Sequence, residues 1–399
     1  MDNDLINISP YQMFLLHIRS PKTKDQYIQK FEHFFKFLSQ QLEEKKFETE
    51  DIEKKYFLLY DKAKSEHWLF NCILKYVHFI NKRVETENLS GATFYNYFKN
   101  IKKFCLANDI EVKWHKLFLS APKKRRAAID RPPSVPEIKT ILEYPDRRIK
   151  FIVLTMCSSG MRIEGWNYLR WRNIKPIQRN GQIIGAKIII YEGDVEEYYS
   201  FITAETYFYI KDWMDYRKEA GESINGDSWI ARDIWNFSVR GSRVCGFATN
   251  PNKLSIKAIK SLINRALWAQ GLRTKLPEGK RRHEFQEAHG FRKFFETQFT
   301  IAGLKREIIN KLMNHSNGVL DSYIKPSEDM LLNEYLKAID YLTINENFRL
   351  KKEVNELKNK TKNNEYVITA KLQEKDEQIK TLMERQEKFE QLYQLAYVF

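Results

Sequence analysis

The chain has 399 residues and a formal net charge of +15, and 43% of it is apolar with 14% aromatic. This length allows two or three domains with cores of their own, and the apolar and aromatic content excludes a disordered chain. The excess of positive charge favours a polyanionic partner, first DNA or RNA and second an anionic membrane, over a generic basic surface.

The cysteines exclude two kinds of stabilised fold. The four cysteines lie far apart without a CxxC pair, which argues against a zinc site and a disulfide framework. The first residues lack the basic start and apolar core of a targeting peptide, and no window reaches the roughly 18 uncharged apolar residues of a membrane span. We therefore expect no metal or other cofactor, no membrane partner, and a cytoplasmic location together with the DNA of the cell. The cysteines are Cys72, Cys105, Cys157 and Cys245.

Residues 1–120 are predicted to form a helical domain. Apolar side chains recur at helical spacing in 27–38, in 70–80 and again after Ser90. In the third of these segments, lysines occupy the face opposite the apolar residues. The pattern fits a compact helical bundle with a lysine-bearing surface, and it also fits a domain that grips the DNA backbone through phosphate contacts. The lysines are Lys99, Lys102 and Lys103.

A basic, proline-containing linker is predicted at 121–133, because proline restricts its own backbone and that of its predecessor. An extended path across a DNA duplex is favoured there over a solvated tether or a localisation signal. The next helix is predicted to begin at Ser134, since Ser134 and Glu137 form a capping box with proline in the first turn. The basic side chains of the linker are Lys123, Lys124, Arg125 and Arg126.

Residues 134–344 are predicted to form a second domain, mainly α with a small antiparallel β-sheet. The sheet is predicted from a turn at Asn180-Gly181, a β-branched strand at 187–191 and its partner at 198–203. Helices are predicted at 151–157, ending near Gly160, at 206–217, and repeatedly after Pro251.

Residues 345–399 differ in composition from everything before them. They are rich in Glu, Lys, Gln and Asn and contain neither glycine nor proline. Apolar residues step by threes and fours from Leu350 to Phe389, with a polar insert at 361–364. A coiled-coil tail is favoured over a lone solvated helix, and self-association is the natural use of such a tail.

Reactive side chains gather between His289 and Tyr323. His289 and Arg292 are three residues apart, so on a helix they share a face. His315 follows Arg292 by 23 residues, and Tyr323 follows His315 by eight. These side chains suit nucleophilic attack on a phosphodiester, with Tyr323 as the nucleophile.

An arginine far upstream completes this set. Arg162 follows a tight turn at Gly160 and is predicted to start a helix that contains Trp166 and Leu169. The backbone N–H groups at a helix start favour anions. A guanidinium matches phosphate with several fixed donors, so Arg162 and Arg292 are expected to clamp the phosphate from two sides.

The two histidines have distinct expected roles. A phenol has a pKa near 10, so only about one in a thousand is ionised at neutral pH and Tyr323 needs a proton acceptor. His289 is the expected base or proton relay, and His315 is expected to donate a hydrogen bond to the phosphate.

Together these residues resemble the tyrosine recombinase (phage integrase) family. The family pattern is an arginine after a glycine-containing turn, then H-x-x-R, a second histidine and the tyrosine nucleophile. Residues 89–105 (LSGATFYNYFKNIKKFC) resemble the core-binding domain of the family, and YIKPSEDMLLNEYLKAI resembles archaeal members. The resemblance covers about residues 8–343 and leaves out the tail. The matching positions are Arg162, His289, Arg292, His315 and Tyr323.

The resemblance implies a site-specific DNA recombinase or integrase. Residues 1–120 would be the core-binding domain and 134–344 the α+β catalytic domain, closing as a clamp on double-stranded DNA. Strands would be cleaved and rejoined through a 3′-phosphotyrosyl intermediate, within a dimer or tetramer to which the coiled coil contributes. The DNA contacts expected are Lys99, Lys102, Lys103, Lys123, Lys124, Arg125, Arg126, Arg281 and Arg282.

The sequence departs from the family at one position. Members usually carry a lysine in the β-hairpin turn, as the acid for the leaving 5′-oxygen, whereas residues 191–198 contain no lysine and four acidic side chains. Lys187 lies four residues before Tyr191 and reaches the site only with a suitable strand orientation. The leaving-group acid is thus unassigned, and the alternative function is a catalytically weakened, recombinase-like DNA-binding protein.

Overall fold

The computed structural model describes residues 8–86, 89–123, 130–237, 244–248, 251–277 and 282–354, and parts of 357–381. The chain divides into two compact units, Met1–Ala127 and Ala128–Phe399. This division falls within the proline-containing segment at 121–133. Each unit has its own apolar core, and we describe each by itself.

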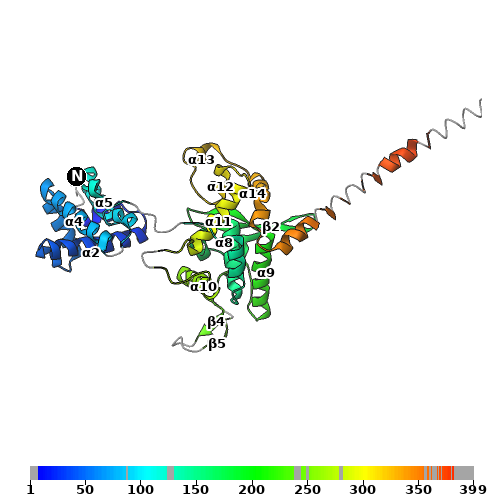
Figure 1. Ribbon diagram of the computed structural model, residues 1–399, viewed down its shortest axis with the longest axis horizontal. Coiled ribbons are helices and arrows are strands. Elements are labelled where there is room, and N and C mark those ends of the chain that lie inside the picture. Colours follow the sequence, from blue (N-terminus) through cyan, green and yellow to red (C-terminus); the bar gives the residue numbers. More distant parts are fainter. Residues whose placement is uncertain are drawn as a thin grey trace, which may run out of the picture. The chain divides into compact units, whose positions relative to one another are not determined.

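The first unit is helical, as predicted, around an aromatic core (Figure 1). Phe31 packs between Tyr56 and Phe104, with ring centroids 4.8 and 5.7 Å away. The helices are α1 Pro10–Leu16, α2 Pro21–Gln41, α3 Ile52–Ala63, α4 Glu66–Thr86, α5 Lys99–Ala107 and α6 Trp114–Leu117, with 3₁₀ turns η1 Lys45–Glu48, η2 Gly91–Tyr97 and η3 Phe118–Ser120.

The segment after Ser90 differs from the single helix that its periodicity predicts. A 3₁₀ turn, η2, comes first, and the α-helix begins only at Lys99. The backbone at Gly91 lies so close to the carbonyl oxygen of Lys123 that an added Cβ would sit 2.8 Å from it. This close approach of an extended segment requires glycine, which weakens a regular helix.

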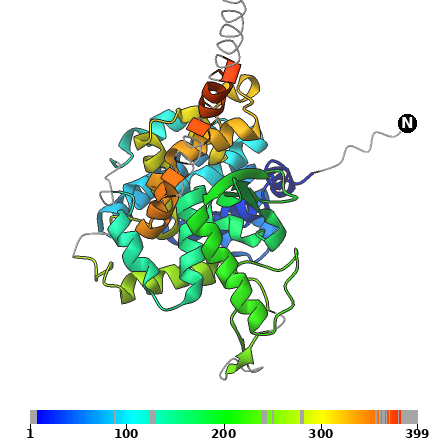
Figure 2. The same ribbon diagram turned by 90° about the vertical axis from the view of Figure 1, so that its right-hand side faces the viewer.

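The second unit is mainly α with a small antiparallel sheet, as predicted (Figures 1 and 2). The sheet has the order β1-β2-β3, and α8 packs against α9, α11 and β3. The helices are α7 Val135–Leu142, α8 Arg147–Ser159, α9 Ala204–Glu219, α10 Ile256–Ala269, α11 Glu287–Ile301, α12 Arg306–Leu312, α13 Leu320–Tyr323 and α14 Glu328–Leu342. The other elements are η4 Ile163–Asn167, η5 Trp171–Asn173, β1 Ile174–Arg179, β2 Gln182–Ile190, β3 Tyr198–Thr203, β4 Trp235–Phe237 and β5 Val244–Phe247.

The predicted turns of the second unit are confirmed. Asn180 and Gly181 both have positive φ, 52° and 73°, as a tight hairpin between β1 and β2 needs. The capping box at Ser134 and Glu137 is present at the start of α7. β2 begins at Gln182, five residues before the predicted strand, because residues 182, 183, 185 and 186 also pair with β1, with a register shift at Ile184.

Gly160 ends α8 in the left-handed conformation, with φ 62°. A Cβ there would lie 2.5 Å from the ring of Phe295, so glycine also permits the close contact between α8 and α11. The helix predicted to hold Trp166 and Leu169 is wrong in type and length, because η4 is a 3₁₀ turn that ends at Asn167. The Leu169 carbonyl instead accepts from Ile230 N at 3.3 Å, which draws this backbone away from a helix.

The C-terminal end of the predicted linker is bound to the second unit. Arg131 donates to both carboxylate oxygens of Glu137 at 2.7 Å and to Glu284 at 2.9 Å. Hydrogen bonds from Arg131, and then from Ser134, lower the pKa of Glu137 to about 2 despite partial burial. Arg131 therefore joins the start of α7 to the segment that precedes α11.

A buried ionic cluster joins the end of α9 to the segment before β4. Glu222 accepts from Arg217 at 2.5 and 2.8 Å and from Arg232 at 2.5 Å, and both guanidiniums are fully buried. Burial works to raise the pKa of Glu222, but the two arginines outweigh it and hold that pKa below its ordinary value. The carboxylate is therefore charged and shared between two cations.

The start of the tail is hydrogen-bonded to α9. The buried carboxylate of Glu205 accepts from Ile344 N at 2.7 Å and from Asn345 N at 3.1 Å. The described residues beyond 346 are helical, and Leu350, Val354 and Leu357 are 56%, 47% and 56% exposed. The coiled coil stays a prediction.

Within the described part of the chain, no helix has the length and apolarity to cross a membrane.

Candidate active site

Arg292 lies at the centre of the site, on α11, three residues before the buried Phe295. It is only 4% exposed. Its guanidinium donates to the carbonyl of Gly160, at the end of α8, and to the carbonyl of Met313 at 2.6 Å, at the end of α12. Arg292 therefore holds together three chain segments that are far apart in the sequence.

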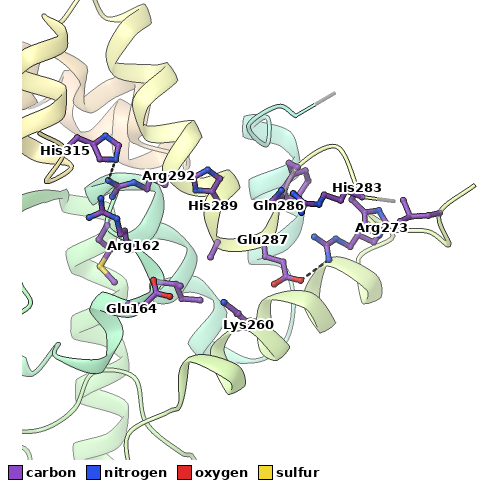
Figure 3. Close-up of a pocket in the computed structure, with 16 residues that line it drawn as sticks. Arg162, Glu164, Lys260, Arg273, His283, Gln286, Glu287, His289, Arg292 and His315 are labelled. Carbon is purple, nitrogen blue, oxygen red and sulfur yellow. Dashed lines mark hydrogen bonds and ion pairs between the residues drawn. The ribbon is translucent and has the colours of Figure 1, made fainter. Parts of the chain in front are cut away.

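His315 is oriented by Arg292. Its Nε2 lies 2.7 Å from Nη2 of Arg292 (Figure 3). A guanidinium has donors only, so Nε2 accepts and the neutral imidazole carries its proton on Nδ1. Burial and then Arg292 lower the pKa of His315, which keeps the ring neutral near pH 7. The Nδ1–H group is thus the one left to donate to a ligand.

His289 lies one helical turn before Arg292, as the three-residue spacing predicts. Burial lowers the pKa of His289, and the charge of neighbouring Lys293 lowers it further. Lys293 is held by an ion pair with Asp130. The imidazole of His289 is therefore neutral near pH 7 and able to accept a proton.

Arg162 lies two residues after Gly160 and immediately before η4, to which its side chain makes no capping hydrogen bond. Its Nη2 donates to the carbonyl of Asn314 at 3.4 Å, the residue before His315. Asn314 has φ 51°, a left-handed conformation that asparagine tolerates. In the turn at 313–315, Arg292 thus contacts the carbonyl of Met313 and Arg162 contacts that of Asn314.

These four side chains line one cavity of about 640 Å³ in the second unit. Figure 3 shows Arg162, Arg292 and His315 together at one side, with His289 beside them. Of the rest of the lining, the sequence predicted only Arg282, as a DNA contact, and no motif marks the other residues. The ionisable side chains in that part of the lining are Glu164, Lys260, Arg273, Arg282, His283 and Glu287.

Tyr323 is placed apart from the other motif residues. It ends α13 and is 79% exposed, and it is absent from the cavity lining within the described residues. Its turn is anchored through Asp321, which pairs with Lys311 at 2.7 Å and accepts from Asn317 N at 2.9 Å. The structure therefore brings together four of the five predicted catalytic side chains and leaves the phenol at the surface.

The acidic hairpin turn is largely occupied by internal contacts. Glu192 pairs with Arg172 at 2.9 Å, and Asp194 accepts from the hydroxyl of Tyr168 at 2.9 Å. Lys187 pairs with Glu328 in α14 and is absent from the cavity lining within the described residues. The strand orientation that would carry Lys187 into the site is therefore not found.

The predicted DNA contacts fall into three groups. Three lysines lie on α5 opposite its buried face. The pKa of the neighbouring Lys30 is lowered, first by burial and then by the charge of Lys99. Lys123 is exposed, and Arg282 lines the cavity. The α5 lysines are Lys99, Lys102 and Lys103, and the predictions outside the described residues are Lys124, Arg125, Arg126 and Arg281.

Comparison with known proteins gives likeness at the level of structure. No protein-family model and no curated protein matches the chain. The chain is similar to the Tn1549 transposon integrase in complex with transposon right end DNA, at 14% identity and a TM-score of 0.47, covering 82% of this chain and 98% of that one. It is similar to XerH site-specific recombinase bound to palindromic difH substrate, at 14% identity and a TM-score of 0.42, covering 71% and 73%.

A third similar structure is XerA recombinase, at 17% identity and a TM-score of 0.33, covering 82% of this chain and 96% of that one. These similar structures are recombinases and integrases. The likeness to archaeal members stays a prediction.

Among the described residues, no group of three His, Cys, Asp or Glu side chains is arranged to hold a metal ion.

Proposed function

We propose that this chain is a site-specific DNA recombinase or integrase that cleaves and rejoins DNA strands through a 3′-phosphotyrosyl intermediate. The observation that carries the proposal is the meeting of Arg162, His289, Arg292 and His315 on one cavity. Two guanidiniums and an N–H donor match the non-bridging oxygens of a phosphodiester, and a neutral imidazole beside them can take a proton.

In the proposed reaction, Tyr323 attacks the phosphorus and His289 accepts the phenolic proton. Arg162 and Arg292 bind the non-bridging oxygens, on which negative charge grows during the attack, and His315 donates its Nδ1–H to the same phosphate. The phosphotyrosyl bond conserves the energy of the broken phosphodiester. A strand with a free 5′-hydroxyl can therefore reverse the reaction without ATP.

The partner is proposed to be double-stranded DNA, in the cytoplasm. Residues 1–120 would form the core-binding domain, 134–344 the catalytic domain and 121–133 the link between them. The exposed lysines of α5, Lys99 and Lys102, support a phosphate-binding surface on the first of these. A dimer or tetramer on DNA would exchange the strands, with the tail at 345–399 as a route to self-association.

The experiment is a search for a covalent protein–DNA adduct. The full chain is incubated with a library of duplexes that have a randomised centre and a nick, so that the short fragment released with a free 5′-hydroxyl diffuses away. Denaturing gels are expected to show an adduct, and mass spectrometry of its peptides is expected to place the DNA on Tyr323. An adduct that persists in Tyr323→Phe contradicts the mechanism.

A second candidate function is a catalytically weakened, recombinase-like protein that holds DNA without cutting it. The surface position of Tyr323, outside the cavity lining of the described residues, favours this candidate. The two candidates differ in one outcome of the same experiment. Duplexes that are retained by the protein without any adduct, across the whole library, support the DNA-holding protein.

A further inference from the structure

Cleavage of a phosphodiester needs an acid as well as a nucleophile. When the bond between phosphorus and the 5′-oxygen breaks, the electron pair stays on that oxygen. Free alkoxides are very basic, since even bulk water has a pKa of about 15.7, so the oxygen must receive a proton as it leaves. The identity of this proton donor goes beyond the function proposed above and rests on it.

Most side chains of the cavity are poor proton donors. The guanidiniums of Arg162 and Arg292 do not lose a proton in proteins. The imidazoles of His289 and His315 have pKa values lowered first by burial, so they are mainly neutral near pH 7. Ionised carboxylates accept hydrogen bonds and have no proton to give.

Lys260 is the one lysine in the cavity lining of the described residues. It lies on α10, directly after Ile259, which is fully buried and fixes that side of the helix in the core. Because α10 packs against η4 and α11, Lys260 lies on the same side of the cavity as Glu164 of η4. Figure 3 shows Lys260 projecting from α10 into this region, on the same cavity as Arg162 and His289.

Other lysines near the site are already used in ion pairs. Lys187 pairs with Glu328, Lys293 with Asp130 and Lys311 with Asp321. Within the described residues, Lys260 forms no ion pair within 4.0 Å. A lysine on a flexible four-carbon stem can follow a leaving oxygen, and it can give up a proton as arginine cannot.

We propose that Lys260 is the general acid for the leaving 5′-oxygen. The phosphorus–phenolic oxygen bond forms while the phosphorus–5′-oxygen bond breaks. The phenolic proton passes to His289, and the ammonium of Lys260 gives its proton to the 5′-oxygen, leaving a neutral amine and a 5′-hydroxyl. In rejoining, that amine takes the proton of the attacking 5′-hydroxyl.

The test compares an oxygen leaving group with a sulfur one. The duplex recovered from the adduct library is made with a 5′-bridging sulfur at the scissile phosphate. A thiol has a pKa near 8.5 and leaves as a thiolate without a proton. Lys260→Ala is expected to slow adduct formation about 10²- to 10⁴-fold on the oxygen substrate and to match the wild type on the sulfur substrate.

Two further variants separate proton donation from charge and from phosphate clamping. Lys260→Arg keeps the charge but lacks a labile proton, so it is expected to be slow on oxygen and normal on sulfur. Arg162→Gln removes a phosphate contact and is expected to be slow on both substrates. Lys257→Ala, one turn earlier on α10 and outside the cavity lining of the described residues, is expected to cleave both like the wild type.

Equal slowing of Lys260→Ala on both substrates, or no slowing on oxygen, overturns the assignment of Lys260. Active Lys260→Arg on oxygen overturns it as well, because charge alone would then suffice. Failure of the proposed function gives a different experimental result. In that case the wild type forms no adduct with any duplex of the library, and no substrate is recovered from it.

Discussion

At the scale of single residues, the two arginines of the site differ in what their loss should do. Arg292 is buried and satisfies the carbonyls of Gly160 and Met313, whereas Arg162 is partly exposed and makes one long bond to a carbonyl. An unsatisfied buried carbonyl costs about 1–3 kcal/mol. Arg292 therefore contributes to stability and to phosphate binding together, while Arg162 contributes mainly to binding.

We expect the two substitutions to separate the effect on stability from the effect on phosphate binding. Arg162→Gln should lower adduct formation about 10²- to 10³-fold with a melting temperature close to that of the wild type. Arg292→Gln should lower adduct formation and also lower the free energy of unfolding by about 1–3 kcal/mol. Thermal denaturation and the adduct assay measure both. Equal melting temperatures for the two variants would show that the backbone contacts of Arg292 are unimportant.

The histidines predict the pH dependence of cleavage. Burial, and then nearby cations, lower the pKa of both His289 and His315. Both rings act in the neutral form, so activity is present above the folded pKa and is lost as pH falls through it. The acid limb of the cleavage rate should have its midpoint below 6.5, the ordinary value for histidine. A rate profile between pH 4.5 and 8 tests this, and a midpoint above 6.5 would contradict it.

The spacing of the motif predicted which residues share the cavity, but not where the phenol lies. His289 and Arg292 share a face because helical geometry fixes positions three apart, and Gly160 turns the chain toward Arg162. The placement of Tyr323 depends on contacts of Asp321 with α12, which no local pattern encodes. Lys260 was missed because its role depends on the packing of α10, and a single exposed lysine carries no signal.

At the scale of elements, the segment joining α9 to β4 depends on the buried cluster of Arg217, Glu222 and Arg232. Removing the carboxylate leaves two buried cations uncompensated, and breaking a buried pair in this way costs about 3–5 kcal/mol. Glu222→Gln should therefore destabilise the second unit by about this amount. Urea denaturation measures it. Glu219→Gln, at the exposed end of α9, is the control and should change little.

The elements themselves show which local rules were sufficient. The capping box at Ser134 and the positive-φ turn at Asn180 were predicted because side-chain caps and turn residues act within four residues. The helix expected after Arg162 and the one expected after Ser90 were wrong in part. In each case the backbone is drawn into contact with a distant segment, residue 230 or Lys123, and local periodicity contains no information on such contacts.

At the scale of the whole molecule, the helical tail carries exposed apolar residues that suit self-association. Its apolar residues Leu350, Val354 and Leu357 are about half exposed, as expected if a partner helix covers them. Replacing all three by asparagine should shift the full chain toward the monomer in sedimentation experiments, without a change in melting temperature. Polar replacements at Glu353 and Lys358 serve as the control. An unchanged oligomeric state would exclude this segment as the contact.

The division into two units follows from composition more than from any single residue. The segment 121–133, with its prolines and basic residues, separates the apolar pattern of the first unit from that of the second. The chain divides within this segment. What composition did not predict is that Arg131 is held by Glu137 and Glu284. Ion pairs between segments 153 residues apart depend on the finished fold of the second unit.

Arg292 is finally a buried cation that hydrogen-bonds to two carbonyls and an imidazole, all of them neutral. Within the described residues no carboxylate pairs with it or with Arg162, and burial lowers the pKa of Arg292 most, with the charge of Arg162 lowering it further. An oxyanion that occupies the site should relieve this repulsion, so folding and anion binding are thermodynamically linked.

Small anions should therefore report on the site without any DNA. Sulfate at about ten times its dissociation constant adds roughly 1.4 kcal/mol to stability, or about 3–6 °C in melting temperature for a domain of this size. The rise should exceed that in chloride of equal ionic strength, and it should shrink in Arg162→Gln. The same rise in both proteins would reflect only the general exclusion of sulfate from protein surfaces.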